Sequence, residues 1–209
     1  MKEISDNTNI LLMEAALRLF TDKGFAGAST REIVEICGVT KPTLYYHFGS
    51  KDNLYRSILE DILNRFNREI ALLVSAKLPP LDKLLKVVRF YLNHCHESPR
   101  KVKLILMAIY RSDPSLPDVD IGTIGRPMVE SIAEIIREGE EAGLLKEGNP
   151  LQLSLQLLGM IHIQILLILN NEDKLPLSKP DIPISIPSIA MRRKKENSRS
   201  TFMITTGPG

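Results

Sequence analysis

The chain has 209 residues, of which 44% are hydrophobic and 25% charged, and its formal net charge is +2. This balance is typical of a globular protein, and so small a charge does not by itself indicate nucleic-acid binding. The only two cysteines, Cys37 and Cys95, lie far apart, which excludes a disulfide framework and the usual metal-ligand spacings. The first residues lack the apolar run of a secretory signal, so we expect a cytoplasmic protein without a metal or cofactor.

Apolar residues recur with the helical period, and sustained alternation of period two is absent, so we predict an all-α fold. Glycine, proline and capping residues divide the chain into helices expected at 8–23, 30–37, 41–47, 51–77, 81–97, 100–111, 117–142 and 150–170. Gly24 is the expected end of the first helix, and Ser50 is the expected N-cap of the fourth. The apolar stretch 157–169 is too short to span a bilayer, so we predict a buried helix and no membrane association.

Three parts of the chain are expected. Residues 1–49 are expected to form an N-terminal three-helix helix-turn-helix domain, and residues 50–175 a second helical domain. Residues 176–190 contain four prolines, Pro176, Pro180, Pro183 and Pro187, and a run of four basic residues follows at 192–195. No amphipathic helix of useful length fits there, so we predict a poorly ordered tail.

The segment 29–48 carries the start signals of two short helices. Ser29 and Glu32 have the spacing of a capping box, in which each side chain satisfies a free backbone N–H group of the other residue. Thr40 is the expected N-cap of the second helix, with Pro42 in the first turn, where no intrahelical donor is needed. Two short helices joined by a tight turn are typical of a helix-turn-helix.

The second of these helices has two different faces. The side chains expected to pack inward from the pair are Ile33, Val34, Cys37, Leu44 and Phe48. The outward face then consists of Lys41, Pro42, Thr43, Tyr45, Tyr46 and His47, without an acidic residue. Lysine and threonine reach base edges in the major groove, and tyrosine hydroxyls and helix N-termini bind phosphates. This face therefore predicts a DNA-binding surface.

The same segment resembles the DNA-binding signature of the TetR family of transcriptional regulators. The matching positions are Thr30, Ile33, Val34, Gly38, Val39, Thr40, Thr43, Leu44, Tyr45, Phe48, Lys51 and Leu54. The resemblance covers about 50 residues, and the rest of the chain is similar only in length and helix count. One departure is Val34, where the family usually has alanine. The larger valine side chain needs slightly more room between the first two helices.

The resemblance implies roles for single residues. Thr30 and Arg31 stand where family members touch phosphate and sometimes a base, and Lys41, Pro42 and Thr43 stand where members read bases. Tyr45, Tyr46, His47 and Lys51 stand where members hold the DNA backbone, and Thr40 begins the recognition helix. The alternative is that a helix-turn-helix packs without binding DNA, and that His47 is simply an exposed polar residue.

A homodimer on a palindromic operator is the assembly that the resemblance implies, because one helix-turn-helix presents little surface. Family members dimerise through their last two long helices. In the eighth helix the expected dimer face is Leu151, Leu155, Leu158, Ile161 and Ile165. A ninth helix is not evident in residues 176–209. Either the dimer is built differently, or the tail is a damaged or frame-shifted version of that helix.

The resemblance also implies that residues 50–175 form a ligand-binding and dimerisation domain that encloses a small-molecule effector. Candidate lining residues are Tyr91, His94, Met107, Tyr110, Arg111, Met128, Met160 and His162, because Met and aromatic side chains suit an apolar pocket with a few polar contacts. Simple core packing is the alternative for each of them. The sequence His94-Cys95-His96 does not favour a metal site, because adjacent helical residues point about 100° apart.

These observations predict a sequence-specific DNA-binding regulator, a ligand-responsive repressor acting as a homodimer on double-stranded operator DNA. An enzyme is the first alternative, but no nucleophile, base and orienting group assemble in the sequence, and no glycine-rich phosphate loop is present. A helical interaction protein that uses the fold without DNA is the second alternative. Replacing Tyr45 and Lys51 with alanine separates the two classes, because a DNA regulator should lose operator binding while it remains folded and dimeric.

Overall fold

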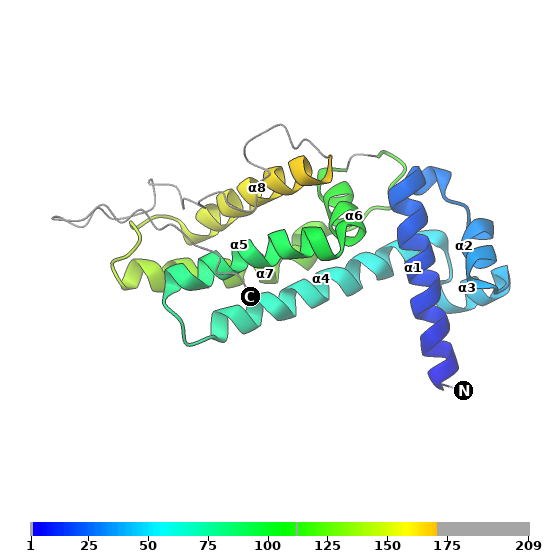
Figure 1. Cartoon of the computed structure of the whole chain (residues 1–209), viewed down its shortest axis with the longest axis horizontal. Coiled ribbons are helices and arrows are strands. Elements are labelled where there is room, and N and C mark those ends of the chain that lie inside the picture. The colour runs from blue at the N-terminus through cyan, green and yellow to red at the C-terminus, as the bar shows by residue number, and fades with distance from the viewer. Residues whose placement is uncertain (1, 112, 171–209) are drawn as a thin grey trace, which may run out of the picture. The chain divides into compact units, whose positions relative to one another are not determined.

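The computed structural model describes residues 2–111 and 113–170, which form eight helices and no strand (Figure 1). The helices are α1 (Lys2–Gly27), α2 (Thr30–Cys37), α3 (Lys41–Phe48), α4 (Lys51–Ser75), α5 (Pro80–Glu97), α6 (Pro99–Tyr110), α7 (Ile121–Glu141) and α8 (Pro150–Leu169). The all-α prediction is confirmed. The tail predicted at 176–209 lies outside the described residues.

Two helices begin elsewhere than predicted. The first helix begins at Lys2 rather than at residue 8, and Gly24 interrupts it with non-helical angles (φ 74°, ψ 168°) instead of ending it. The seventh begins at Ile121 rather than at 117. The Asp120 carboxylate accepts the Thr123 N–H at 2.9 Å and the Thr123 hydroxyl at 2.6 Å. This side-chain cap starts the helix later than the apolar pattern suggested.

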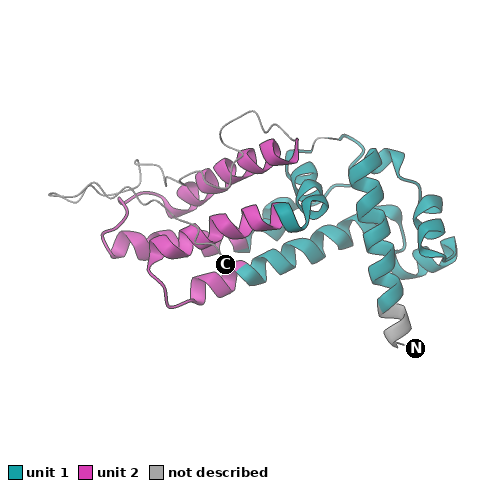
Figure 2. Cartoon of the chain, viewed as in Figure 1, with its two compact units in different colours: residues 1–69, 96–127 teal, residues 70–95, 128–209 magenta. Residues whose placement is uncertain are grey.

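The chain forms two compact units (Figure 2). Unit 1 comprises residues 1–69 and 96–127, and unit 2 comprises residues 70–95 and 128–209. The helix-turn-helix therefore packs in one unit with the first part of α4 and with α6. The functional boundary expected at residues 49 and 50 stays a prediction.

Unit 1 is built on an aromatic cluster at the end of α1. The rings of Phe20, Phe25 and Tyr55 are all buried, with centroids 5.3–5.6 Å apart. Tilted and edge-on aromatic pairs of this kind stabilise a core beyond their buried area, by about 0.5–1.5 kcal/mol each. The cluster joins α1 to the first turns of α4, which follow directly after the helix-turn-helix.

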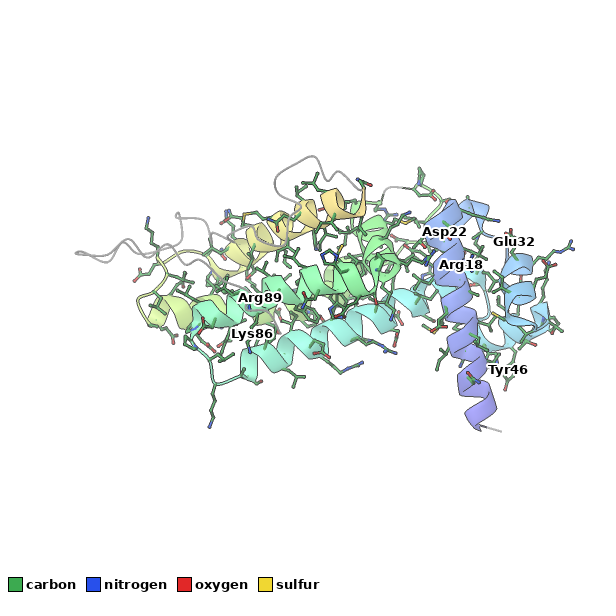
Figure 3. All side chains as sticks on the ribbon, in the orientation of Figure 1. Arg18, Asp22, Glu32, Tyr46, Lys86 and Arg89 are labelled. Carbon is green, nitrogen blue, oxygen red and sulfur yellow. The ribbon has the colours of Figure 1, made fainter. Side chains whose placement is uncertain are left out.

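Polar contacts also hold α6 against α1 within unit 1. The Lys103 ammonium donates to the Thr21 carbonyl at 2.6 Å, and Arg100 lies 3.6 Å from Asp22, which Figure 3 labels on α1. Arg56 of α4 donates to the Asp118 carbonyl at 3.2 Å, so the segment between α6 and α7 contacts α4 as well. The helix-turn-helix is therefore supported on a frame made of three other helices.

The core of unit 2 is formed by one face each of α5, α7 and α8. Its buried side chains include Val87, Tyr91, Ile132, Ile135, Leu158, Ile161 and Ile165. Burying each such aliphatic side chain stabilises the fold by about 1.5–3 kcal/mol relative to leaving it exposed. Three of the five residues predicted for the dimer face, Leu158, Ile161 and Ile165, thus belong to the core of the protomer, and that part of the prediction is wrong.

The opposite face of α8 is apolar and exposed. Leu155 is 59% exposed and Ile163 55%, and Leu151 and Met160 are also exposed. The prediction of a buried helix over 157–169 is therefore wrong for this side, where Met160 and Ile163 are exposed. In the described part of the chain α8 is the one helix long and apolar enough to cross a membrane, by length and composition alone. Because its other side is built into the core, this composition is weak evidence of a membrane span.

Candidate nucleic-acid interface

The cap of α2 is the capping box predicted from its sequence. The Ser29 hydroxyl accepts the Glu32 N–H at 3.1 Å, and the Glu32 carboxylate accepts the Ser29 N–H at 3.2 Å. At the other end Gly38 adopts left-handed angles (φ 65°, ψ 27°), and the Val39 N–H returns to the Val34 carbonyl at 3.0 Å. A glycine is favoured at this conformation because it has no Cβ. The turn between α2 and α3 is thereby fixed.

The start of α3 differs in detail from the prediction. Thr40 has the extended angles of an N-cap, but its side chain makes no capping hydrogen bond. Its hydroxyl lies 3.0 Å from the Thr43 hydroxyl instead. The N-terminal backbone donors of α3 are therefore not satisfied by a side-chain cap from Thr40, which suits an anion-binding helix end. At the next junction the Ser50 hydroxyl accepts the Asn53 N–H at 3.0 Å, as predicted.

The outward face of α3 is exposed, as the sequence indicated. Leu44 is fully buried, whereas Tyr46, labelled in Figure 3, is 85% exposed and Tyr45 47%. Lys41 and Pro42 are exposed, and Thr43 and His47 are half-buried. The His47 ring lies edge-on to the Tyr46 ring, with centroids 5.2 Å apart. The structure thus brings a lysine, a threonine, two tyrosines and a histidine together on one surface.

The acidic residues of α2 are neutralised by neighbouring cations. Glu32 accepts a 2.5 Å hydrogen bond from Lys23, which with the Ser29 donors lowers the pKa of that carboxyl. Glu35 pairs with Arg31 at 2.7 Å, and both side chains are exposed. An exposed pair of this spacing contributes only about 0.3–0.5 kcal/mol, so Arg31 can leave it for a phosphate at little cost. Thr30, the other residue proposed at this helix start, is half-buried.

Lys51 is placed differently from the other candidates. Its ammonium donates to the Phe25 carbonyl at 2.5 Å and lies 4.2 Å from the centroid of the Phe25 ring. The residue is half-buried, and burial lowers its pKa, against the fields of Asp52 and Asp113. Its role as a phosphate contact stays a prediction, and the geometry gives its charge another partner.

Three of the proposed effector-site residues meet inside unit 2. The Tyr91 hydroxyl donates to the Met128 sulfur, and the Tyr91 and His162 rings lie 6.3 Å apart. Burial raises the pKa of Tyr91 and lowers that of His162, so both are neutral at pH 7. The His94 and Phe90 rings are tilted against each other with centroids 4.3 Å apart, and Met160 is exposed. This trio, in which Tyr91 and Met128 are buried and His162 is half-buried, fits either an apolar binding site or plain core packing.

The remaining candidates lie in unit 1 and are separate from that trio. Met107 is half-buried and Tyr110 is exposed. Arg111 adopts left-handed angles (φ 45°) and pairs with Asp118 at 2.7 Å. Arg111 and Asp118 help to line an open surface cleft of about 520 Å³ at the start of α7. The two groups of candidates are therefore in different units.

The two cysteines are poorly suited to reactive thiol chemistry. Burial raises the pKa of both Cys37 and Cys95, which disfavours the reactive thiolate. Within residues 2–111 and 113–170, no three His, Cys, Asp or Glu side chains are placed to hold a metal ion.

One residue with a notable role was missed by the sequence reasoning. Asp113 faces the interruption of α1, with a carboxylate oxygen 3.5 Å from where a Cβ on Gly24 would stand. In the sequence it is part of an Asp-Pro pair between two helices, which indicates only a turn. Nothing local signals a contact nearly 90 residues away.

Comparison with known proteins identifies relatives of this chain. The sequence profile described as "Bacterial regulatory proteins, tetR family" matches residues 12–58. The transcriptional repressor NicS of Pseudomonas putida is 25% identical over 144 residues, which are 68% of this chain and 68% of NicS. The transcriptional regulator RutR of Escherichia coli is 27% identical over 146 residues, 66% of this chain and 65% of RutR. The chain thus matches about two thirds of the length of these relatives.

The fold has close counterparts among solved structures. The structure of AibR in complex with isovaleryl coenzyme A and operator DNA superimposes with a TM-score of 0.62 and 22% sequence identity, over 78% of this chain and 86% of that one. Such a likeness shows a common fold.

Proposed function

Since this chain is a helix-turn-helix transcriptional regulator of the TetR family, we propose that it represses transcription as a ligand-responsive homodimer on a palindromic operator. The observation that carries the DNA-binding part is the exposed face of α3. Lys41, Tyr45 and Tyr46 are exposed there while Leu44 anchors the helix from behind.

Specific contacts are divided between two groups of residues. Lys41, Pro42 and Thr43 lie at the N-terminal end of α3, the end that faces base edges when such a helix enters the major groove. Tyr45, Tyr46 and His47, together with Thr30, Arg31 and Thr40, are proposed to hold sugar and phosphate. The formal charge of the whole chain is only +2, so binding depends on this local surface and weakens as salt rises.

The homodimer is proposed through the exposed stripe of α8. Leu151, Leu155 and Ile163 follow one another at multiples of four residues along the helix, with Gly159 at the remaining position. Among the described residues, no side chain or other segment comes within 4 Å of a Cβ added at Gly159. A stripe of this kind lets a second helix approach closely and bury apolar surface that water now covers. Dimerisation then pairs two recognition helices for two half-sites.

An effector is proposed to act on unit 2, where Tyr91, Met128 and His162 meet. AibR was solved with isovaleryl coenzyme A, and an acyl compound of moderate size is one class that a Met- and aromatic-lined site accepts. The effector changes DNA affinity only if it binds the DNA-competent and DNA-incompetent states with different affinity. We place the protein in the cytoplasm, together with its DNA.

Selection of bound fragments from random double-stranded DNA tests this proposal. We expect the full-length chain to enrich one sequence with two inverted half-sites about one helical turn or more apart. Recovery of a single half-site would contradict the homodimer, and failure to enrich any sequence would contradict specific DNA binding. An interaction protein that uses the fold without DNA would give the latter result.

A further inference from the structure

The interruption of α1 leaves backbone groups near the helix-turn-helix that need partners from elsewhere. Gly24 has a positive φ of 74°, so the helical hydrogen-bond pattern breaks at this residue. Phe25 follows, with its ring buried between Phe20 and Tyr55. The Phe25 ring is therefore held in the core, and the peptide groups on either side of it lie next to the interruption of α1 at Gly24.

Lys51 supplies a partner for the Phe25 carbonyl. The distance from its nitrogen to the Phe25 oxygen is 2.5 Å, and the same ammonium lies over the Phe25 ring at 4.2 Å. A charge-assisted hydrogen bond and a cation–π contact act on one residue. The contact closes a stretch of chain that contains α2 and α3, because Phe25 precedes the helix-turn-helix and Lys51 follows it directly.

Asp113 lies on the other side of the same stretch of chain. Its carboxylate is anchored by the Ser115 N–H at 2.8 Å and the Ser115 hydroxyl at 2.6 Å, and it faces Gly24. These Ser115 donors, then the Phe25 N–H and the charge of Lys51, lower the pKa of Asp113. The carbonyl of Phe25 is thus bound by a cation, and an anion from a different segment lies beside the Gly24–Phe25 peptide.

We propose that Lys51 and Asp113 are positioning residues that clamp Phe25, and that this clamp sets the pose in which α3 is presented to DNA. The Phe25 clamp, made of Phe25, Lys51 and Asp113, joins the chain before the helix-turn-helix to the chain after it. Lys51 then serves DNA binding through Phe25, rather than as a phosphate ligand. This inference rests on the proposed DNA-binding function.

The two roles of Lys51 predict different salt dependence. Each phosphate contact contributes about 0.9 to the slope of log affinity against log salt. Loss of a phosphate ligand lowers that slope, whereas loss of a clamp weakens binding at every salt concentration and leaves the slope unchanged. Asp113 separates the roles further, because a carboxylate that faces α1 has no reason to aid a direct phosphate contact.

The test uses full-length Lys51→Met, Asp113→Asn and the double variant on the duplex recovered by selection, across a series of salt concentrations. We expect each single variant to bind roughly 10-fold more weakly, as for a lost hydrogen bond to a charged group. We also expect wild-type slopes and a double variant no weaker than the weaker single one. A slope lowered by about 0.9 in Lys51→Met, with wild-type binding by Asp113→Asn, would overturn the clamp.

Amide hydrogen exchange measures the effect of the clamp in the absence of DNA. In the free wild-type chain, the amide of Phe25 is expected to exchange hydrogen slowly, and Asp113→Asn is expected to speed that exchange roughly 10-fold. Unchanged exchange at residues 24–28 would contradict the clamp even if DNA binding is confirmed. If exchange rises as expected but wild-type protein binds no DNA, the proposed function fails and the clamp stands as a structural contact.

Discussion

The ammonium of Lys83 lies 2.7 Å from the carboxylate of Glu138, and the same ammonium donates to the Val74 carbonyl at 2.7 Å. The Lys83 side chain is only 7% exposed. The pair therefore ties α5 to α7 and to the last turn of α4 inside unit 2. A buried ammonium is stable only while such partners remain.

Removal of Glu138 alone should destabilise the protein more than removal of the pair. We expect Glu138→Gln to lower the free energy of unfolding by about 3 kcal/mol, because a buried charge loses its counter-ion. The double variant Lys83→Met, Glu138→Leu should recover most of that loss. Urea denaturation measures both, and equal stability of Glu138→Gln and wild type would show that the pair is not needed.

Tyr55 carries a buried hydroxyl that has no hydrogen-bond partner among the described residues. Burial, with the nearby charge of Asp113, raises its pKa to about 12. Tyr55→Phe removes an unsatisfied polar group and keeps the ring, so we expect stability equal to wild type or higher by about 1 kcal/mol. Tyr91→Phe is the matched control, because the Tyr91 hydroxyl has Met128 as its partner. If Tyr55→Phe is the less stable of the two variants, the hydroxyl has a role that the structure does not show.

His162 should make unit 2 sensitive to mild acid. Burial lowers its pKa below the ordinary value of 6.5, so in mild acid the unfolded chain binds a proton that the folded chain does not. The free energy of unfolding should fall as the pH drops below about 6.5 and stop falling below the folded pKa. The neighbouring Tyr91 stays protonated throughout this range.

Denaturation at pH 7.5 and 5.5 measures this effect. His162→Gln should show a smaller difference between the two pH values than wild type. The carboxylates whose pKa values are lowered, such as Asp113 and Asp120, titrate below this window. The same pH dependence in the variant would exclude His162 as its source.

The exposed stripe of α8 should control assembly. We expect Leu155→Glu with Ile163→Glu to yield a folded monomer, because two buried charges oppose the interface. Leu72→Glu, at an exposed apolar residue of α4, is the control and should leave the mass in sedimentation unchanged. A dimer that survives both glutamates would place the interface elsewhere, whereas loss of helicity would mean that the stripe is needed within the protomer.

Local sequence signals predicted the helix-turn-helix well. The capping box of Ser29 and Glu32, the glycine turn and the inward Leu44 depend on residues only a few positions apart, and all are present in the structure. The resemblance to a family pointed to the same segment. These are the features for which short-range chemistry decides the outcome.

Contacts between distant segments could not be predicted in the same way. Helix α8 is apolar all round, so its periodicity does not indicate which side faces the core. The predicted dimer face therefore includes Leu158 and Ile161, which are buried in the protomer. The position of Lys51 at the start of α4 was evident, but its direction toward Phe25 depends on how α1 packs. Asp113 acquires its role only through folding.

The central claim is that the face of α3 that begins at Lys41 binds DNA. Lys41→Ala and Lys86→Ala remove one exposed lysine each, from α3 and from α5 (Lys86 is labelled in Figure 3), and change the net charge equally. Affinity for the selected duplex, measured at several salt concentrations, should fall about 10- to 100-fold for Lys41→Ala and stay at the wild-type value for Lys86→Ala. Equal affinity of Lys41→Ala and Lys86→Ala for the duplex would contradict this claim, whether both variants bind like wild type or both bind more weakly.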